Sequence, residues 1–98
     1  MSYFKYVGQK LFIENSSVLN IAKKNKTPFY LYSESKIKEN YLNFEKVFKN
    51  IKPLICFATK ANTNLTILRT LKKLGCGADV VSGGEMLKAL NAGIKPNK

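Results

Sequence analysis

From residue 54 onward the sequence alternates between short apolar runs and helical patterns, and this alternation constrains the fold more than any other feature. The apolar runs cover residues 54–58 and 78–81, and the helical patterns cover residues 65–74 and 85–91. Short apolar runs are typical of strands buried on both faces, and the strand–helix–strand order predicts parallel strands joined by a right-handed crossover. The predicted fold class is therefore α/β.

The length of the chain limits this prediction. Parallel sheets need helices on both faces, and two strands with their connecting helices do not provide that cover. We therefore expect the 98 residues to be the first part of a larger α/β architecture. A complete small α/β domain is the alternative.

The residues before 54 contain shorter signals. Residues 3–7 and 11–14 have a β-like composition, and Asn15-Ser16-Ser17 is a capping signal before a short helix over residues 18–22. Residues 29–32 are rich in aromatic side chains and follow a proline, which predicts another strand.

A longer helix is predicted after Ser33 and Ser35, either of which can cap it. Its apolar side chains recur with helical spacing and predict one stripe that faces the core. These side chains are Ile37, Tyr41, Phe44 and Phe48. A helix over residues 65–74 has leucines at similar spacing, and Gly75 stands where a helix-ending glycine belongs. Gly83-Gly84 predicts a turn.

The charge of the chain suggests one other class of function. Seventeen basic residues against six acidic ones give a net charge of +11, which raises the possibility of a basic nucleic-acid-binding module. However, Arg69 is the only arginine and the lysines are scattered, whereas arginine is the residue suited to bidentate recognition of phosphate and guanine. We therefore expect no specific nucleic-acid partner.

Cys56 and Cys76 are too few for a disulfide framework or a zinc site, and there is no histidine to complete a metal site. We expect Cys56 to be an inert buried thiol. No apolar run reaches the length of a membrane span, and the first five residues lack the apolar core of a secretory signal. A reducing cytoplasm is the expected location, without a membrane partner.

Lys60 is the candidate for chemistry. It follows the apolar run that ends at Ala58, and α/β folds bind ligands at the carboxyl ends of their strands. A partly desolvated lysine there can act as a neutral amine and form a Schiff base. The same position also suits an ordinary solvated lysine.

The segment Phe57-Ala58-Thr59-Lys60-Ala61-Asn62, before a helix that ends at Gly75, resembles the pyridoxal 5'-phosphate attachment site of the decarboxylases that act on ornithine, diaminopimelate and arginine. The segment from Gly77 to Glu85 resembles the diaminopimelate branch of that family, and so do residues 27–32. The resemblance covers residues 27–98.

The resemblance implies the N-terminal part of a (β/α)8 TIM-type barrel over residues 27–98, with residues 1–26 contributing to a β-sandwich domain. Lys60 would hold the cofactor and act in catalysis, on a small amino-acid substrate. Ala58 would leave room for the pyridine ring, and the Asp79 carboxylate would lie close to the cofactor, although Asp79 also suits a cap. Glu85 matches a carboxylate near the site, and it also suits the first turn of a helix.

The implied reaction is decarboxylation of meso-2,6-diaminopimelate to L-lysine by a homodimer, with most of the barrel beyond residue 98. Ornithine, arginine and carboxynorspermidine decarboxylases of the same fold are the alternatives.

Overall fold

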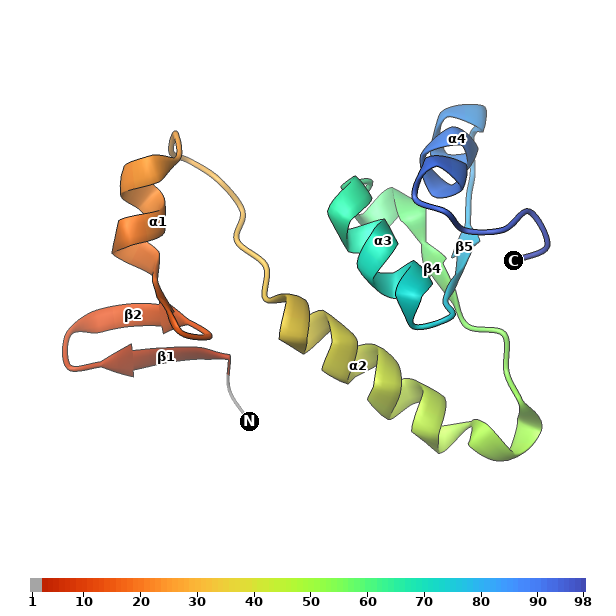
Figure 1. The fold of residues 1–98 in the computed structure, drawn as a ribbon, viewed down its shortest axis with the longest axis horizontal. Helices are drawn as coiled ribbons and strands as arrows, with labels where there is room; N and C mark the ends of the chain where they lie inside the picture. Colours follow the sequence, from red (N-terminus) through yellow and green to blue (C-terminus); the bar gives the residue numbers. More distant parts are fainter. Residues whose placement is uncertain (1–2) are drawn as a thin grey trace. The chain divides into compact units, whose positions relative to one another are not determined.

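The computed structural model describes residues 3–98 (Figure 1), which fall into two compact units, residues 3–36 and residues 37–98. Within residues 3–98, no helix has both the length and the apolar character needed to cross a membrane.

The first unit begins with a small antiparallel sheet in the order β1-β2-β3. It consists of β1 (Phe4–Val7), β2 (Lys10–Ile13) and β3 (Ser16–Ser17), and helix α1 (Val18–Lys24) follows. The Ser17 hydroxyl accepts a hydrogen bond from the Asn20 amide at 3.4 Å, which caps α1. The two β-like pieces and the short capped helix predicted here are confirmed.

The strand predicted over residues 29–32 is wrong. This segment belongs to neither sheet, and Tyr30 is 88% exposed. Its ring stacks on that of Tyr32, with 6.5 Å between the centroids. Aromatic side chains favour strands because they pack well on a pleated, half-buried surface. Residues 29–32 belong to no sheet, so no neighbouring strand provides that surface.

Ser33 caps the long helix α2 (Glu34–Val47) as predicted, because its hydroxyl accepts a hydrogen bond from the Lys36 amide at 3.1 Å. The same hydroxyl donates to Glu14 Oε1 at 2.9 Å, and that oxygen also accepts from the Ser35 amide at 3.1 Å. Glu14 therefore supports the start of α2 from a turn 19 residues earlier, which no local sequence pattern predicts.

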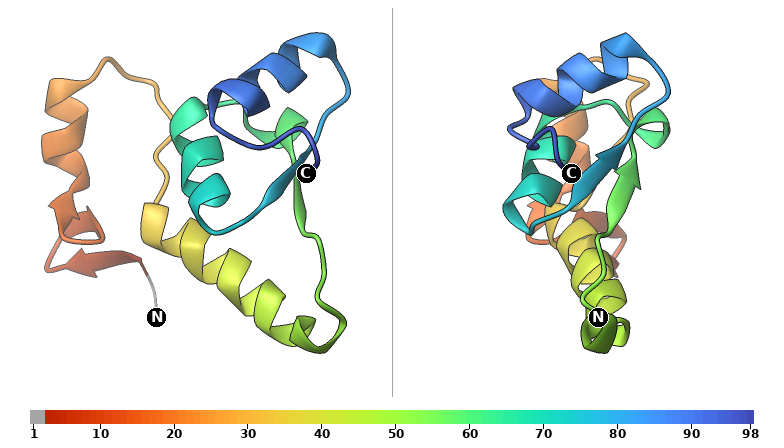
Figure 2. Two further views of the ribbon diagram at one scale, coloured as in Figure 1. Left: turned by 45° about the vertical axis from the view of Figure 1, so that its right-hand side comes forward. Right: turned by 90° about the vertical axis from the view of Figure 1, so that its right-hand side faces the viewer.

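The second unit contains the predicted strand–helix–strand arrangement. Strands β4 (Cys56–Ala58) and β5 (Gly77–Asp79) are parallel and adjacent, and α3 (Leu65–Lys73) connects them. Helix α4 (Gly83–Asn91) follows β5 and packs against α3. Figure 2 shows the two strands side by side in both views. The strands are shorter than predicted, since residues 54–55 and 80–81 lie outside the ladder.

The core of the second unit joins α2, α3 and the residue before β5 through three buried side chains, Tyr41, Leu71 and Cys76. Ile37 packs against this cluster, so the first half of the apolar stripe on α2 is confirmed. The second half is wrong, because Phe44 and Phe48 are 54% and 39% exposed. Their rings contact each other at 4.9 Å between centroids. Helical spacing predicts which side chains share a face but not how far the covering elements extend along it.

Helices α3 and α4 end with the same hydrogen-bonded motif. Gly75 and Gly93 have φ angles of 95° and 96°, and they donate to the carbonyls of Lys72 and Leu90, respectively. The next amide in each case, from Cys76 or Ile94, donates to a carbonyl five residues back. This is the Schellman arrangement, which satisfies carbonyl groups at a helix end and favours glycine at the left-handed position.

Candidate functional site

The carboxyl ends of β4 and β5 bring together the residues predicted for the site. Ala58 and Asp79 are the last residues of their strands and are partners across the parallel ladder. Lys60 lies two residues beyond Ala58, in the short 3-10 turn η2 (Thr59–Ala61). In α/β folds, ligands bind at the edge formed by the carboxyl ends of parallel strands.

The side chain of Lys60 is exposed at this edge. Within residues 3–98 its ammonium group makes no hydrogen bond or ion pair. Strand alternation does not set its direction, because β4 ends at Ala58 and the backbone then enters η2. The geometry of this turn therefore decides where Lys60 points.

Asp79 is exposed and is not the cap of α4, which is Ser82. The interpretation of Asp79 as a helix cap is therefore wrong. Its carboxylate is left at the same edge as Lys60, beside the half-buried Ala58.

Ser82 and Glu85 form a reciprocal cap at the start of α4. The Glu85 amide donates to Ser82 Oγ at 3.1 Å, and Glu85 Oε1 accepts from the Val81 amide at 3.3 Å. Gly83 and Gly84 are the first two residues of this helix, so the turn predicted for them is wrong. The cap starts the helix early enough to include both glycines, despite their cost of about 1 kcal/mol each relative to alanine.

The two cysteines differ in burial. Burial raises the pKa of the Cys76 thiol, which donates to the Gly77 carbonyl at 3.2 Å. Both effects make Cys76 a poor nucleophile. Cys56 is exposed, so its predicted burial is wrong, and its thiol lies 3.6 Å from the Lys98 carbonyl. Over the described part of the chain, no three His, Cys, Asp or Glu side chains are placed to hold a metal ion.

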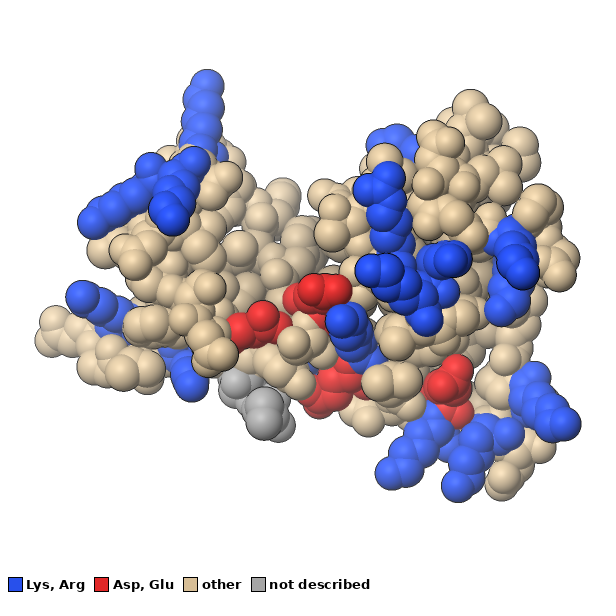
Figure 3. Space-filling model, in the orientation of Figure 1, with Lys and Arg blue, Asp and Glu red and all other residues tan. Residues whose placement is uncertain are grey.

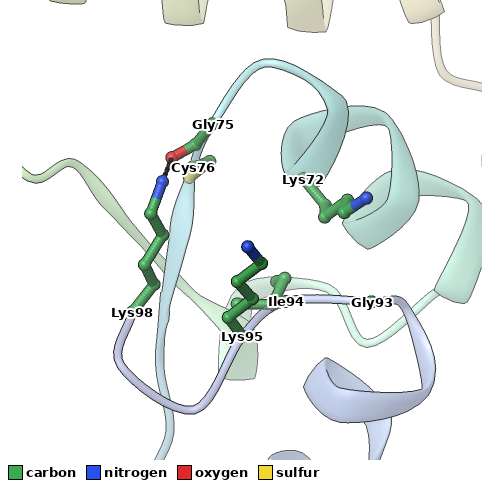
Figure 4. A pocket seen from close by; sticks show the side chains of 7 residues that line it. All are labelled: Lys72, Gly75, Cys76, Gly93, Ile94, Lys95 and Lys98. Atoms are coloured by element: carbon green, nitrogen blue, oxygen red, sulfur yellow. Dashed lines mark hydrogen bonds between the residues drawn. The ribbon is translucent and has the colours of Figure 1, made fainter.

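A small cavity of about 100 Å³ lies at the other end of β5 (Figure 4), next to the residues that precede this strand. It is lined by Lys72, Gly75, Cys76, Gly93, Ile94, Lys95 and Lys98. Ligand pockets usually have volumes of roughly 300–1,000 Å³, so this cavity is small for a cofactor. Helices α3 and α4 end here, and lysines stabilise the partial negative charge of helix C-termini. Lys98 Nζ donates to the Gly75 carbonyl at 3.2 Å.

The basic side chains on the face seen in Figure 3 lie in several separate groups. This distribution agrees with the scattered lysines of the sequence. It gives no continuous basic surface on that face for a nucleic-acid backbone to follow.

Comparisons with known proteins give one family. The family model described as "Pyridoxal-dependent decarboxylase, pyridoxal binding domain" matches residues 34–98. Diaminopimelate decarboxylase of Helicobacter pylori strain J99 is 60% identical over 73 residues, which are 74% of this chain and 18% of that protein. Diaminopimelate decarboxylase of Pseudomonas fluorescens is 42% identical over 98 residues, which are 100% of this chain and 24% of that protein.

Two solved structures are also similar. AQ1208 from Aquifex aeolicus has a TM-score of 0.91 and 45% identity, over 96% of this chain and 23% of that one. Diaminopimelate decarboxylase from M. jannaschii, in co-complex with L-lysine, has a TM-score of 0.87 and 39% identity, over 93% of this chain and 22% of that one. The chain thus spans about a quarter or less of the length of the relatives that it matches.

Proposed function

This chain belongs to the pyridoxal-dependent decarboxylases, over their pyridoxal-binding domain, and from that membership we propose that the protein decarboxylates meso-2,6-diaminopimelate to L-lysine. The observation that carries the proposal is the shared edge of β4 and β5, where Ala58, Asp79 and Lys60 lie in a chain similar to several diaminopimelate decarboxylases.

The residues at this edge fit pyridoxal phosphate. Lys60 presents an exposed amine with no partner in residues 3–98, so it can bond covalently with the cofactor's aldehyde carbon. Ala58 has only a methyl side chain, so it takes up little of the room that a flat ring would need at the end of β4. Asp79 is the partner of Ala58 across the parallel ladder, and it supplies a carboxylate at that position.

When bound, pyridoxal phosphate accepts the electron pair that carbon dioxide leaves behind. The chain's own groups then have separate roles. Lys60 would hold the cofactor, and its Nζ, when not bonded to the cofactor, would return a proton to the substrate carbon. Asp79 adds negative charge at the edge, which favours a nearby protonated group.

We also propose that residues 27–98 begin a (β/α)8 barrel and that residues 1–26 contribute to a β-sandwich domain. The parallel β4–β5 pair with its connecting helix supports the first assignment, and the antiparallel β1-β2-β3 sheet supports the second. Such barrels need about 250 residues, more than this chain contains. The homodimer and the cytoplasmic location remain predictions.

Labelling of the full-length protein tests the assignment of Lys60. The protein is incubated with pyridoxal phosphate, reduced with borohydride and digested, and the pyridoxyl mass should lie on the peptide that contains Lys60. Release of L-lysine from meso-2,6-diaminopimelate should exceed turnover of ornithine and arginine. A label on another lysine contradicts the site, and a preference for ornithine or arginine contradicts the substrate.

A further inference from the structure

We propose that Asn62 is a positioning residue for Lys60, and that its side-chain oxygen fixes the backbone turn on which Lys60 is held. The inference rests on the proposed function, since it assumes that Lys60 binds the cofactor. It follows from a chain of hydrogen bonds between η2 and α3.

The turn that carries Lys60 is closed by one backbone hydrogen bond. The Asn62 amide donates to the Thr59 carbonyl at 3.1 Å, which closes the turn around Lys60. Asn62 then has φ −163° and ψ 115°, so the chain leaves the turn in an extended conformation. A single backbone hydrogen bond contributes little net stability, so this bond alone holds the exposed Lys60 weakly.

The Asn62 side chain extends this connection to α3. Its Oδ1 accepts a hydrogen bond from the Asn64 amide at 3.0 Å, which is the Asx-turn geometry. Asn64 Oδ1 in turn accepts from the Thr66 amide at 2.8 Å and caps α3. Two successive asparagine side chains therefore link the turn that carries Lys60 to the first turn of a helix.

Buried side chains anchor the two ends of this link. Thr59 is fully buried immediately before Lys60, and Leu68, on α3, is fully buried as well. Lys88 on α4 also reaches the loop, with its Nζ 3.5 Å from Thr63 Oγ1. Residues 60–62 lie between the anchored positions Thr59 and Thr63. The side-chain acceptor that restrains them is Asn62 Oδ1.

Covalent capture of a cofactor requires the amine to reach one carbon atom, and misplacement by about 1 Å can cost about 100-fold in rate. Without the Asn62 acceptor, the backbone between Lys60 and Asn64 gains conformations in which the amine is misplaced. The expected result is weaker cofactor binding without a comparable loss of folding.

The test uses full-length protein with Asn62→Ala, Asn62→Ser and Asn62→Asp, and with Ser17→Ala as the control that removes a helix cap in the first unit. The dissociation constant of pyridoxal phosphate is measured by absorbance, and the rate of labelling at Lys60 by mass spectrometry. Asn62→Ala should weaken binding and slow labelling by about tenfold. Asp and Ser should restore most of the loss, because both can accept the same backbone hydrogen bond.

The outcomes separate the two proposals. If unsubstituted protein carries no label at Lys60, the proposed function fails. If Lys60 is labelled but Asn62→Ala binds and reacts like the unsubstituted protein, the positioning role fails. It also fails if folded Asn62→Asp and Asn62→Ser both lose as much as alanine, or if Ser17→Ala loses as much affinity as Asn62→Ala. Where Asn62→Ala does not fold, the Asp and Ser variants decide the test, because both keep the acceptor: binding and labelling close to those of the unsubstituted protein support the positioning role, and a loss of about tenfold or more in both contradicts it.

Discussion

Ala58 and Asp79 are partners at the last position of two parallel strands, and this pairing sets the geometry of the site. It places the backbone that leads to Lys60 beside the end of β5, although Asp79 lies 19 positions after Lys60 in the sequence. Parallel pairing requires a crossover, and α3 provides it. The lysine proposed to hold the cofactor and a carboxylate therefore reach one edge through the topology of the sheet.

Replacement of Lys60 should abolish turnover in the full-length protein. Lys60→Ala removes both the covalent anchor and a proton donor, so decarboxylation should fall by at least about 10³-fold. Lys60→Arg should fail almost as badly, because a guanidinium stays charged and cannot bond with an aldehyde. Lys46→Ala, on an exposed position of α2, is the matched control and should retain activity. Near-normal turnover by Lys60→Ala would exclude the assigned role.

Two buried threonines should respond in opposite ways to replacement by valine. Thr59 is fully buried, and its hydroxyl has no hydrogen-bond partner within residues 3–98. Thr70 is 5% exposed, and its hydroxyl donates to the Thr66 carbonyl at 2.9 Å. Thr59→Val should therefore raise the free energy of unfolding by about 1 kcal/mol, and Thr70→Val should lower it by about as much.

Urea unfolding of the two threonine variants beside the unsubstituted protein measures both changes. A loss of stability in Thr59→Val would show that the hydroxyl has a partner in the full-length protein.

Two glycines of the second unit differ in the space around them. A Cβ on Gly77 would lie 2.5 Å from the Lys98 carbonyl oxygen and 2.9 Å from Cys56 Sγ. A Cβ on Gly83 would meet nothing within 4 Å, and Gly83 lies in a helix. Gly77→Ala should therefore lower the free energy of unfolding by about 1–3 kcal/mol, whereas Gly83→Ala should raise it by up to about 1 kcal/mol. Equal thermal unfolding midpoints for the two variants would contradict the close packing at Gly77.

The sequence predicts the helices and strands of this fold better than it predicts which of their side chains are buried. Helix caps and helix-ending glycines are local signals, and Ser17, Ser33 and Gly75 act as predicted. Exposure depends on what covers an element, so the buried positions expected for Phe44 and Cys56 are wrong. The edge position of Lys60 follows from the alternation of strands and helices. The asparagine link behind Lys60 does not, because it depends on side-chain geometry that spacing does not encode.

The last prediction concerns Tyr41 at alkaline pH. Its side chain is buried, and burial, followed by the nearby Glu45 carboxylate, raises the pKa of Tyr41 from 10.0 to about 12. The Tyr41 hydroxyl donates to Glu45 Oε2 at 3.3 Å, a long hydrogen bond whose loss should cost no more than about 1 kcal/mol. In the unfolded chain the same hydroxyl ionises near pH 10, as an unperturbed tyrosine does.

The sign of the pH dependence follows from these two values. The contribution of neutral Tyr41 is fully present below pH 10, and it is lost as the pH rises through about 12, since only the unfolded chain ionises readily in that range. Tyr41→Phe cannot ionise, so the stability difference between the two proteins should be constant from about pH 7 to 9 and then shift in favour of phenylalanine. Urea unfolding at a series of pH values measures this difference, and the titration of lysines, common to both proteins, cancels. A difference that stays constant up to pH 12 would show that Tyr41 is not held neutral by the fold.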